Sequence, residues 1–111
     1  MQIQTRREGE AAVVAVGGKL DMVTAAGFQQ ALHEGIASGE KRVVLDFGEL
    51  SYVSSAGIGA VMMVARELRN EGGELRISNL RDNVAKIFDI CGIGKVVPVH
   101  GSVADALAAG A

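Results

Sequence analysis

The sequence predicts an α/β fold in which a mixed, mostly parallel sheet of about five strands is combined with four helices. From residue 11 onward, short runs rich in valine, leucine and isoleucine alternate with longer segments whose apolar residues recur at helical spacing. Glycines, 15 in all, stand between these segments and indicate many short connections. The 111 residues are 49% hydrophobic and 22% charged, which is typical of a globular chain and predicts a single domain over residues 1–111.

Five segments have the composition of strands. The first is polar and is expected at an edge of the sheet, whereas the second is a continuous apolar run that a glycine pair ends. Turn-forming residues between them predict an antiparallel hairpin. Proline in the last segment predicts a second edge, because proline has no N–H to donate to a ladder. The expected strands are Gln2–Arg7, Ala11–Val16, Arg42–Phe47, Glu74–Ser78 and Val96–Val99.

Four segments have apolar residues at helical spacing. Thr24 and Ser102 stand where helix N-caps are expected, and Gly39, Gly72 and Gly92 stand where helices are expected to end. The resulting order is β-β-α-β-α-β-α-β-α, which favours parallel strands with one antiparallel edge. The predicted apolar faces are Phe28, Leu32 and Ile36, then Ile58, Val61, Met62, Ala65 and Leu68, then Val84, Ile87, Phe88 and Cys91, and finally Val103, Ala106 and Leu107.

Charge and composition exclude several classes of function. The net charge of −2 provides no electrostatic basis for holding nucleic acid or anionic lipid. The longest nearly apolar run, Ala56–Ala65, has about half the length of a membrane span, so no direct membrane insertion is expected. The polar segment Met1–Glu10 is unlike a secretory signal, and a soluble cytoplasmic protein is expected. One cysteine and two isolated histidines predict neither a metal site nor a cofactor.

Enzyme motifs are incomplete. Gly57 and Gly59 lack the third glycine of a dinucleotide fingerprint, and there is no Walker motif. Ser55 has no evident histidine or lysine base in the sequence, and the strand-to-helix elbow of a hydrolase serine is absent. A receiver domain would need paired acids after the first buried strand, where Gly17 and Gly18 stand instead. The sequence therefore predicts a binding protein and not an enzyme.

The most informative segment joins the third predicted strand to the second predicted helix, where Ser54 and Ser55 are followed by Gly57. If Ser55 is the N-cap, its oxygen bonds an amide of the first turn and lies at the positive end of the helix dipole. A phosphate on that oxygen would suit the fold, and Gly57 would open access to it. A purely structural cap explains the same serine, and local chemistry alone favours that reading.

Five motifs in order resemble the STAS domain, and specifically the stand-alone anti-sigma factor antagonists of bacteria. The resemblance implies a STAS-like fold that binds an anti-sigma factor with serine kinase activity and thereby releases a sigma factor. It implies that the kinase phosphorylates Ser55, that phosphorylation ends binding, and that a serine phosphatase reverses it. The motifs are Gly18–Ala25, Val44–Phe47, Tyr52–Gly59, Gly72–Leu75 and Ile90–Ile93, and the resemblance extends from Ile3 to Leu107.

The resemblance also assigns residues around the acceptor. Asp21 matches an acid of the family and is either a partner contact or an acid favoured by the helix dipole. Many antagonists carry aspartate where this chain has Ser54, which makes Ser54 a second, weaker acceptor and leaves open a module without phosphorylation, such as a transporter accessory or scaffold. Met63 either belongs to a helix buried on several sides or joins the partner surface. The predicted partner-binding residues are Asp21, Thr24, Ser54, Gly57, Ile58 and Met63.

Overall fold

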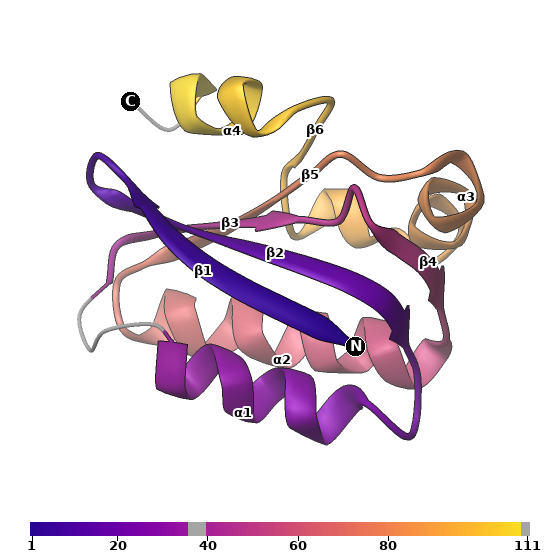
Figure 1. Ribbon diagram of the computed structural model, residues 1–111. Helices are drawn as coiled ribbons and strands as arrows, with labels where there is room; N and C mark the ends of the chain where they lie inside the picture. The colour runs from indigo at the N-terminus through magenta and orange to yellow at the C-terminus, as the bar shows by residue number, and fades with distance from the viewer. Residues whose placement is uncertain (36–39, 110–111) are drawn as a thin grey trace.

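A six-stranded sheet with helices on both faces organises the computed structural model, which describes residues 1–35 and 40–109 (Figure 1). Helices α1 (Ala25–Gly35) and α2 (Ser55–Asn70) pack against each other beneath the sheet. The short helix α4 (Val103–Ala109) covers the opposite face, and α3 (Asp82–Ile90) packs on β4 (Leu50–Val53) at one end. The predicted α/β fold with four helices is confirmed.

The strands follow the order β1–β2–β3–β5–β6, and β4 pairs with the far end of β2. Only the β1–β2 hairpin is antiparallel among the described pairs, and every other pair is parallel. The hairpin, the parallel sheet and the antiparallel edge are therefore confirmed. The remaining strands are β1 (Gln2–Glu8), β2 (Ala11–Leu20), β3 (Arg42–Asp46), β5 (Glu74–Ser78) and β6 (Val99–His100).

Strand β2 is longer than the sequence predicts. The glycine pair does not end it, because Gly18 adopts a φ of +94° at an irregularity of the ladder and the strand continues to Leu20. The sequence predicts no strand between β3 and α2, but β4 forms there and pairs with this extension. The amide of Gly18 donates to the carbonyl of Glu49 at 3.0 Å and joins the two. The extension brings the end of β2 to the start of α2.

The end of the chain also differs from expectation. Most of the predicted strand Val96–Val99 is not strand, because the 3₁₀ helix η1 (Ile93–Lys95) turns the chain and only β6 pairs with β5. Cys91, predicted to be buried, is exposed. It is the C-cap of α3, and the buried Ile93 after the left-handed Gly92 takes the core position instead. Two residues assigned to the first helix and its end, Ile36 and Gly39, lie outside the described residues.

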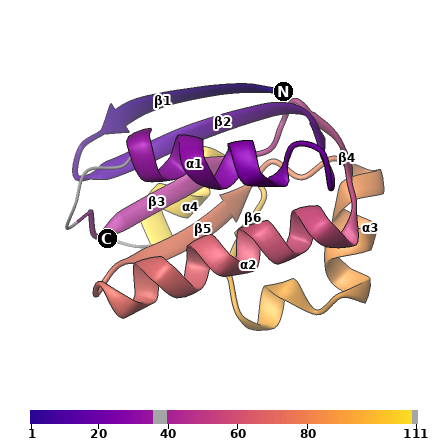
Figure 2. The ribbon, with the colours of Figure 1, turned by 90° about the horizontal axis from the view of Figure 1, so that it is seen from below.

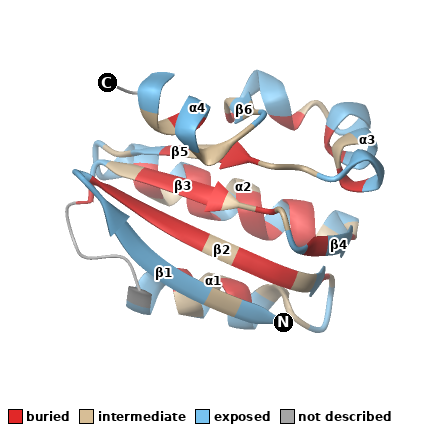
Figure 3. Cartoon of the chain, turned by 45° about the horizontal axis from the view of Figure 1, so that its top comes forward, coloured by how far each residue is buried: buried red, intermediate tan, exposed pale blue. Residues whose placement is uncertain are grey.

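The main core lies between the sheet and the pair α1 and α2. Alternate residues of β2 face opposite sides, so that Val14 belongs to the main core while Val13 packs with Val44 and Ala106 beneath α4. Figure 3 shows the buried centre of the sheet along β2 and β3 and the exposed edge strand β1. Both faces of β2 are covered, which explains why its sequence is a continuous apolar run.

The exposed strand β1 is held to the rest of the sheet by an ion pair as well as by its ladder. Arg7 donates to both carboxylate oxygens of Glu40, at 2.8 and 3.2 Å, and the side chain of Glu40 is only 6% exposed. These hydrogen bonds and the charge of the carboxylate raise the pKa of Arg7 above its ordinary value. The fork geometry fixes β1 beside the residues that lead into β3.

The aromatic contact between α3 and the end of β3 provides a test of the core. The rings of Phe47 and Phe88 meet edge to face with centroids 6.0 Å apart, and both side chains are buried. We expect Phe88→Ala to lower the free energy of unfolding by about 3–5 kcal/mol, because it leaves a cavity. Ile90→Ala on the same helix changes an 83% exposed side chain and should have little effect. Urea denaturation measures both, and equal effects of the two changes would contradict this packing.

Candidate functional site

The candidate site lies where α1 and α2 both begin. Figures 1 and 2 show the loop from β2 to α1 beside the first turn of α2. A hydrogen bond joins the two segments, since the amide of Ser54 donates to the carbonyl of Leu20 at 3.0 Å. The segments around Asp21 and Ser55, which are far apart in the sequence, are therefore brought together as the resemblance implies.

The loop before α1 is a closed turn. Asp21 Oδ1 accepts from the amides of Val23 and Thr24 at 3.0 and 3.2 Å. Thr24 Oγ1 accepts from the amide of Asp21 at 2.9 Å and donates to the carbonyl of Lys19 at 2.8 Å. Thr24 precedes α1 as predicted, but its hydroxyl closes this turn and does not bond a helix amide. Both predicted polar residues thus have a structural role here.

Ser54, and not Ser55, is the N-cap of α2. Ser54 has extended backbone angles, and its Oγ accepts from the amide of Gly57 at 3.3 Å. The reading of Ser55 as the cap is therefore wrong, because the helix begins one residue earlier than the sequence suggested. Ser55 is the first residue of the helix and is exposed. Among the described residues, no side chain or backbone group forms a hydrogen bond with its hydroxyl.

Gly57 allows α2 to approach the end of β2. A Cβ at this position would lie 2.3 Å from the carbonyl oxygen of Leu20, so no other residue fits without a shift. Gly57 is buried and does not open access to Ser55, which corrects the expectation for this residue. Gly59 is different, since it is exposed and a Cβ there would meet nothing within 4 Å.

The exposed face of α2 carries Ser55, Gly59 and Met63 at intervals of four residues. Met63 is 45% exposed, whereas Ile58 is 8% exposed and packs in the main core. Of the predicted partner-binding residues, Gly57 and Ile58 thus lie beneath the surface. Asp21, Thr24 and Ser54 are half-buried around the junction.

Sequence reasoning missed the tip of the closed turn. Met22 and Val23 are 83% and 89% exposed, although both are apolar. The signal was present, because two apolar residues between Asp21 and Thr24 have no helical or strand period to place them in a core. We call these two residues the apolar tip.

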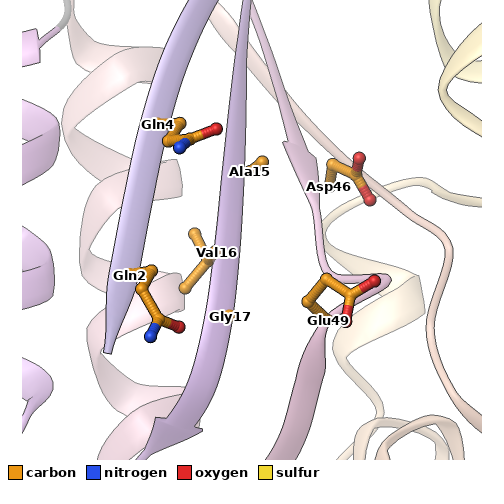
Figure 4. A pocket seen from close by; sticks show the side chains of 7 residues that line it. All are labelled: Gln2, Gln4, Ala15, Val16, Gly17, Asp46 and Glu49. Carbon is orange, nitrogen blue, oxygen red and sulfur yellow. The ribbon is translucent and has the colours of Figure 1, made fainter.

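Asp46 shapes the end of β3 and the turn that follows it. Its Oδ1 accepts from the amide of Gly48 at 3.0 Å and from Asn79 Nδ2 at 3.1 Å. It also borders a recess of about 220 Å³ between β1 and the end of β3 (Figure 4). None of the predicted site residues lines this recess, whose walls are Gln2, Gln4, Ala15, Val16, Gly17, Asp46 and Glu49.

The described part of the chain holds no group of three or more histidine, cysteine or acidic side chains that could bind a metal ion. Within the same residues, none of the helices has the length and apolar character required to cross a membrane.

The model of the STAS domain family matches residues 2–106. The chain belongs to the STAS domain family. It is 37% identical over 97 residues to BtrV of Bordetella bronchiseptica, whose name places it among candidate anti-sigma factor antagonists, with 87% of this chain and 84% of BtrV covered.

Solved structures of other proteins share the fold. An anti-sigma factor antagonist from Mycobacterium paratuberculosis superposes with a TM-score of 0.88 at 24% identity, over 97% of this chain and 92% of that one. The Bacillus cell fate determinant SpoIIAA in its phosphorylated form gives 0.64 at 23% identity, over 99% and 100%. The resemblance stated from the sequence is confirmed at the level of family and fold.

The two glycines of α2 should respond oppositely to alanine. Gly57→Ala forces a methyl group against the Leu20 carbonyl and should lower the free energy of unfolding by about 1–3 kcal/mol. Gly59→Ala fills open space on a helix and should raise it by about 0.5–1 kcal/mol. Thermal melts of the two variants test this, and a stabilised Gly57→Ala would show that α2 does not depend on the close approach.

Proposed function

We propose that this STAS domain is an anti-sigma factor antagonist whose docking surface is switched by phosphorylation of Ser55. The observation that carries the proposal is the exposed, unengaged hydroxyl of Ser55 at the start of α2. The names of the relatives support antagonism, and SpoIIAA is a protein of this fold that exists in a phosphorylated form. The partner is an anti-sigma factor that is also a serine kinase, and unmodified chain binds it and releases the sigma factor in the cytoplasm.

The geometry favours Ser55 over Ser54 as the acceptor. Ser54 Oγ is engaged with the amide of Gly57, and its residue is half-buried. A phosphate on Ser54 would replace the cap and crowd the junction with Leu20. Ser55 Oγ does not cap the helix. In the transfer, Ser55 Oγ gives its proton to a base of the kinase and bonds the γ-phosphorus of ATP, while the bond from that phosphorus to the ADP oxygen breaks and ADP leaves. Water later hydrolyses the phosphate ester on the phosphatase and returns serine and inorganic phosphate.

The helix start can hold the added charge. A phosphoserine carries about −1.5 to −2 charges at neutral pH. The first amides of a helix lack intrahelical acceptors and the helix dipole is positive there, so an anion is favoured at this position. Phosphorylation should therefore alter the surface without unfolding the domain. A partner surface that accepts a neutral hydroxyl beside apolar side chains would be left with an uncompensated anion.

Many antagonists carry aspartate where this chain has Ser54. This difference is the basis for the alternative that the chain is a module without phosphorylation. Ser54 performs the capping that aspartate also performs well, since both are preferred N-cap residues. The substitution therefore leaves the start of α2 intact, and it does not by itself favour a transporter accessory or scaffold role.

Phosphorylation of Ser55 is tested by incubating the chain with its anti-sigma kinase and ATP and recording the intact mass. We expect one added phosphate on the wild type and on Ser54→Ala, and none on Ser55→Ala. The phosphorylated chain should bind the kinase at least about tenfold more weakly, because docking would desolvate the anion. A phosphate that persists in Ser55→Ala would assign the switch to another residue.

The stability of the modified chain is a separate prediction. Because the phosphate lies at the positive end of α2, the melting temperature of phosphorylated chain should be equal to or higher than that of the unmodified chain. Differential scanning calorimetry at low ionic strength measures this. A clear decrease would mean that phosphorylation acts by disrupting the helix start and not through the surface.

A further inference from the structure

The apolar tip is the most exposed apolar feature of the candidate site. Met22 and Val23 are 83% and 89% exposed and lie directly between Asp21 and Thr24. Their loop is joined to the first turn of α2 by the hydrogen bond from Ser54 to Leu20. The tip and Ser55 are therefore exposed residues of two segments that meet at the same junction.

The turn that carries the tip is closed by hydrogen bonds, and the side chains of the tip are exposed. The turn is closed by the side chains of Asp21 and Thr24 and by backbone groups, including the amide of Val23. The carbonyl of Asp21 also accepts from the amide of Ala25 at 2.9 Å. None of these bonds uses the side chain of Met22 or Val23. Because the backbone of the turn is already ordered, a partner that covers the tip has only its side chains left to order.

Stability does not explain these two side chains. At this exposure they contribute little to the core, and polar residues would satisfy the same turn. Their burial by a partner would be favourable in proportion to the apolar area covered. Methionine also adapts its shape to the recess that receives it.

We propose that Met22 and Val23 are the specificity-determining contact of the antagonist and enter an apolar recess of the anti-sigma factor beside the site that receives Ser55. This proposal rests on the proposed function and specifies that the anti-sigma factor contacts the tip through an apolar recess. The tip supplies affinity for the correct partner, and Ser55 supplies the switch. A partner with a polar or charged recess would be rejected, because apolar side chains cannot satisfy its buried groups.

The test compares the double variant Met22→Ser, Val23→Ser with Ile90→Ser. Ile90 is a matched control, because it is also 83% exposed and lies on another element, α3. The probe is the purified ATP-binding anti-sigma factor of the same genome that binds the wild-type chain, and the readout is its dissociation constant by calorimetry. Circular dichroism melts confirm that all three chains fold equally.

We expect the double variant to bind at least about tenfold more weakly, and Ile90→Ser to bind like the wild type. The KM for phosphorylation of Ser55 should rise in the double variant while kcat is retained, since the tip docks but does not touch the reacting hydroxyl. Unchanged affinity of the double variant, or an equal loss in Ile90→Ser, overturns the inference and leaves the proposed function standing. A wild-type chain that binds no anti-sigma factor overturns both.

Discussion

The first turn of α2 touches the end of β2 more closely than any side chain would allow. Gly57 packs on the carbonyl of Leu20, and the neighbouring amide of Ser54 donates to the same oxygen. This junction fixes where α2 begins and thus where Ser55 projects. It also anchors the turn that follows Leu20. The position of each candidate functional group relative to the others depends on this one contact.

The junction exists because β2 extends beyond its first glycine. Strand β2 pairs with β1 and β3 along most of its length and with β4 at its end. Gly18 supplies the backbone conformation that lets the strand change partners there. Residues of β2 are buried on both faces of the sheet, so the end of this strand is a well-packed support for the first turn of α2.

The sequence predicts the α/β class and the hairpin, because hydrophobic period depends on local residues. That Asp21 and Ser55 lie at the same end is implied by the resemblance to the STAS domain. The sequence does not predict β4, since Leu50–Val53 is too short for a period and its pairing with β2 is a tertiary event. The cap of α2 is misplaced by one residue, because two adjacent serines satisfy the same local rule. The role of Gly57 required the position of the Leu20 carbonyl, which only the fold supplies.

The same end of the molecule divides into a buried layer and an exposed layer. Gly57 and Ile58 hold the helix on the sheet, while Ser55 and the apolar tip project from it. A phosphate on Ser55 would change the exposed layer and leave the cap intact, because Ser54 Oγ and not Ser55 Oγ accepts from the amide of Gly57. A domain built in this way can change its affinity for a partner without changing its own fold. Under the proposed phosphorylation of Ser55, the cap and the acceptor are different residues, because Ser54 is the N-cap and Ser55 is the first residue of α2.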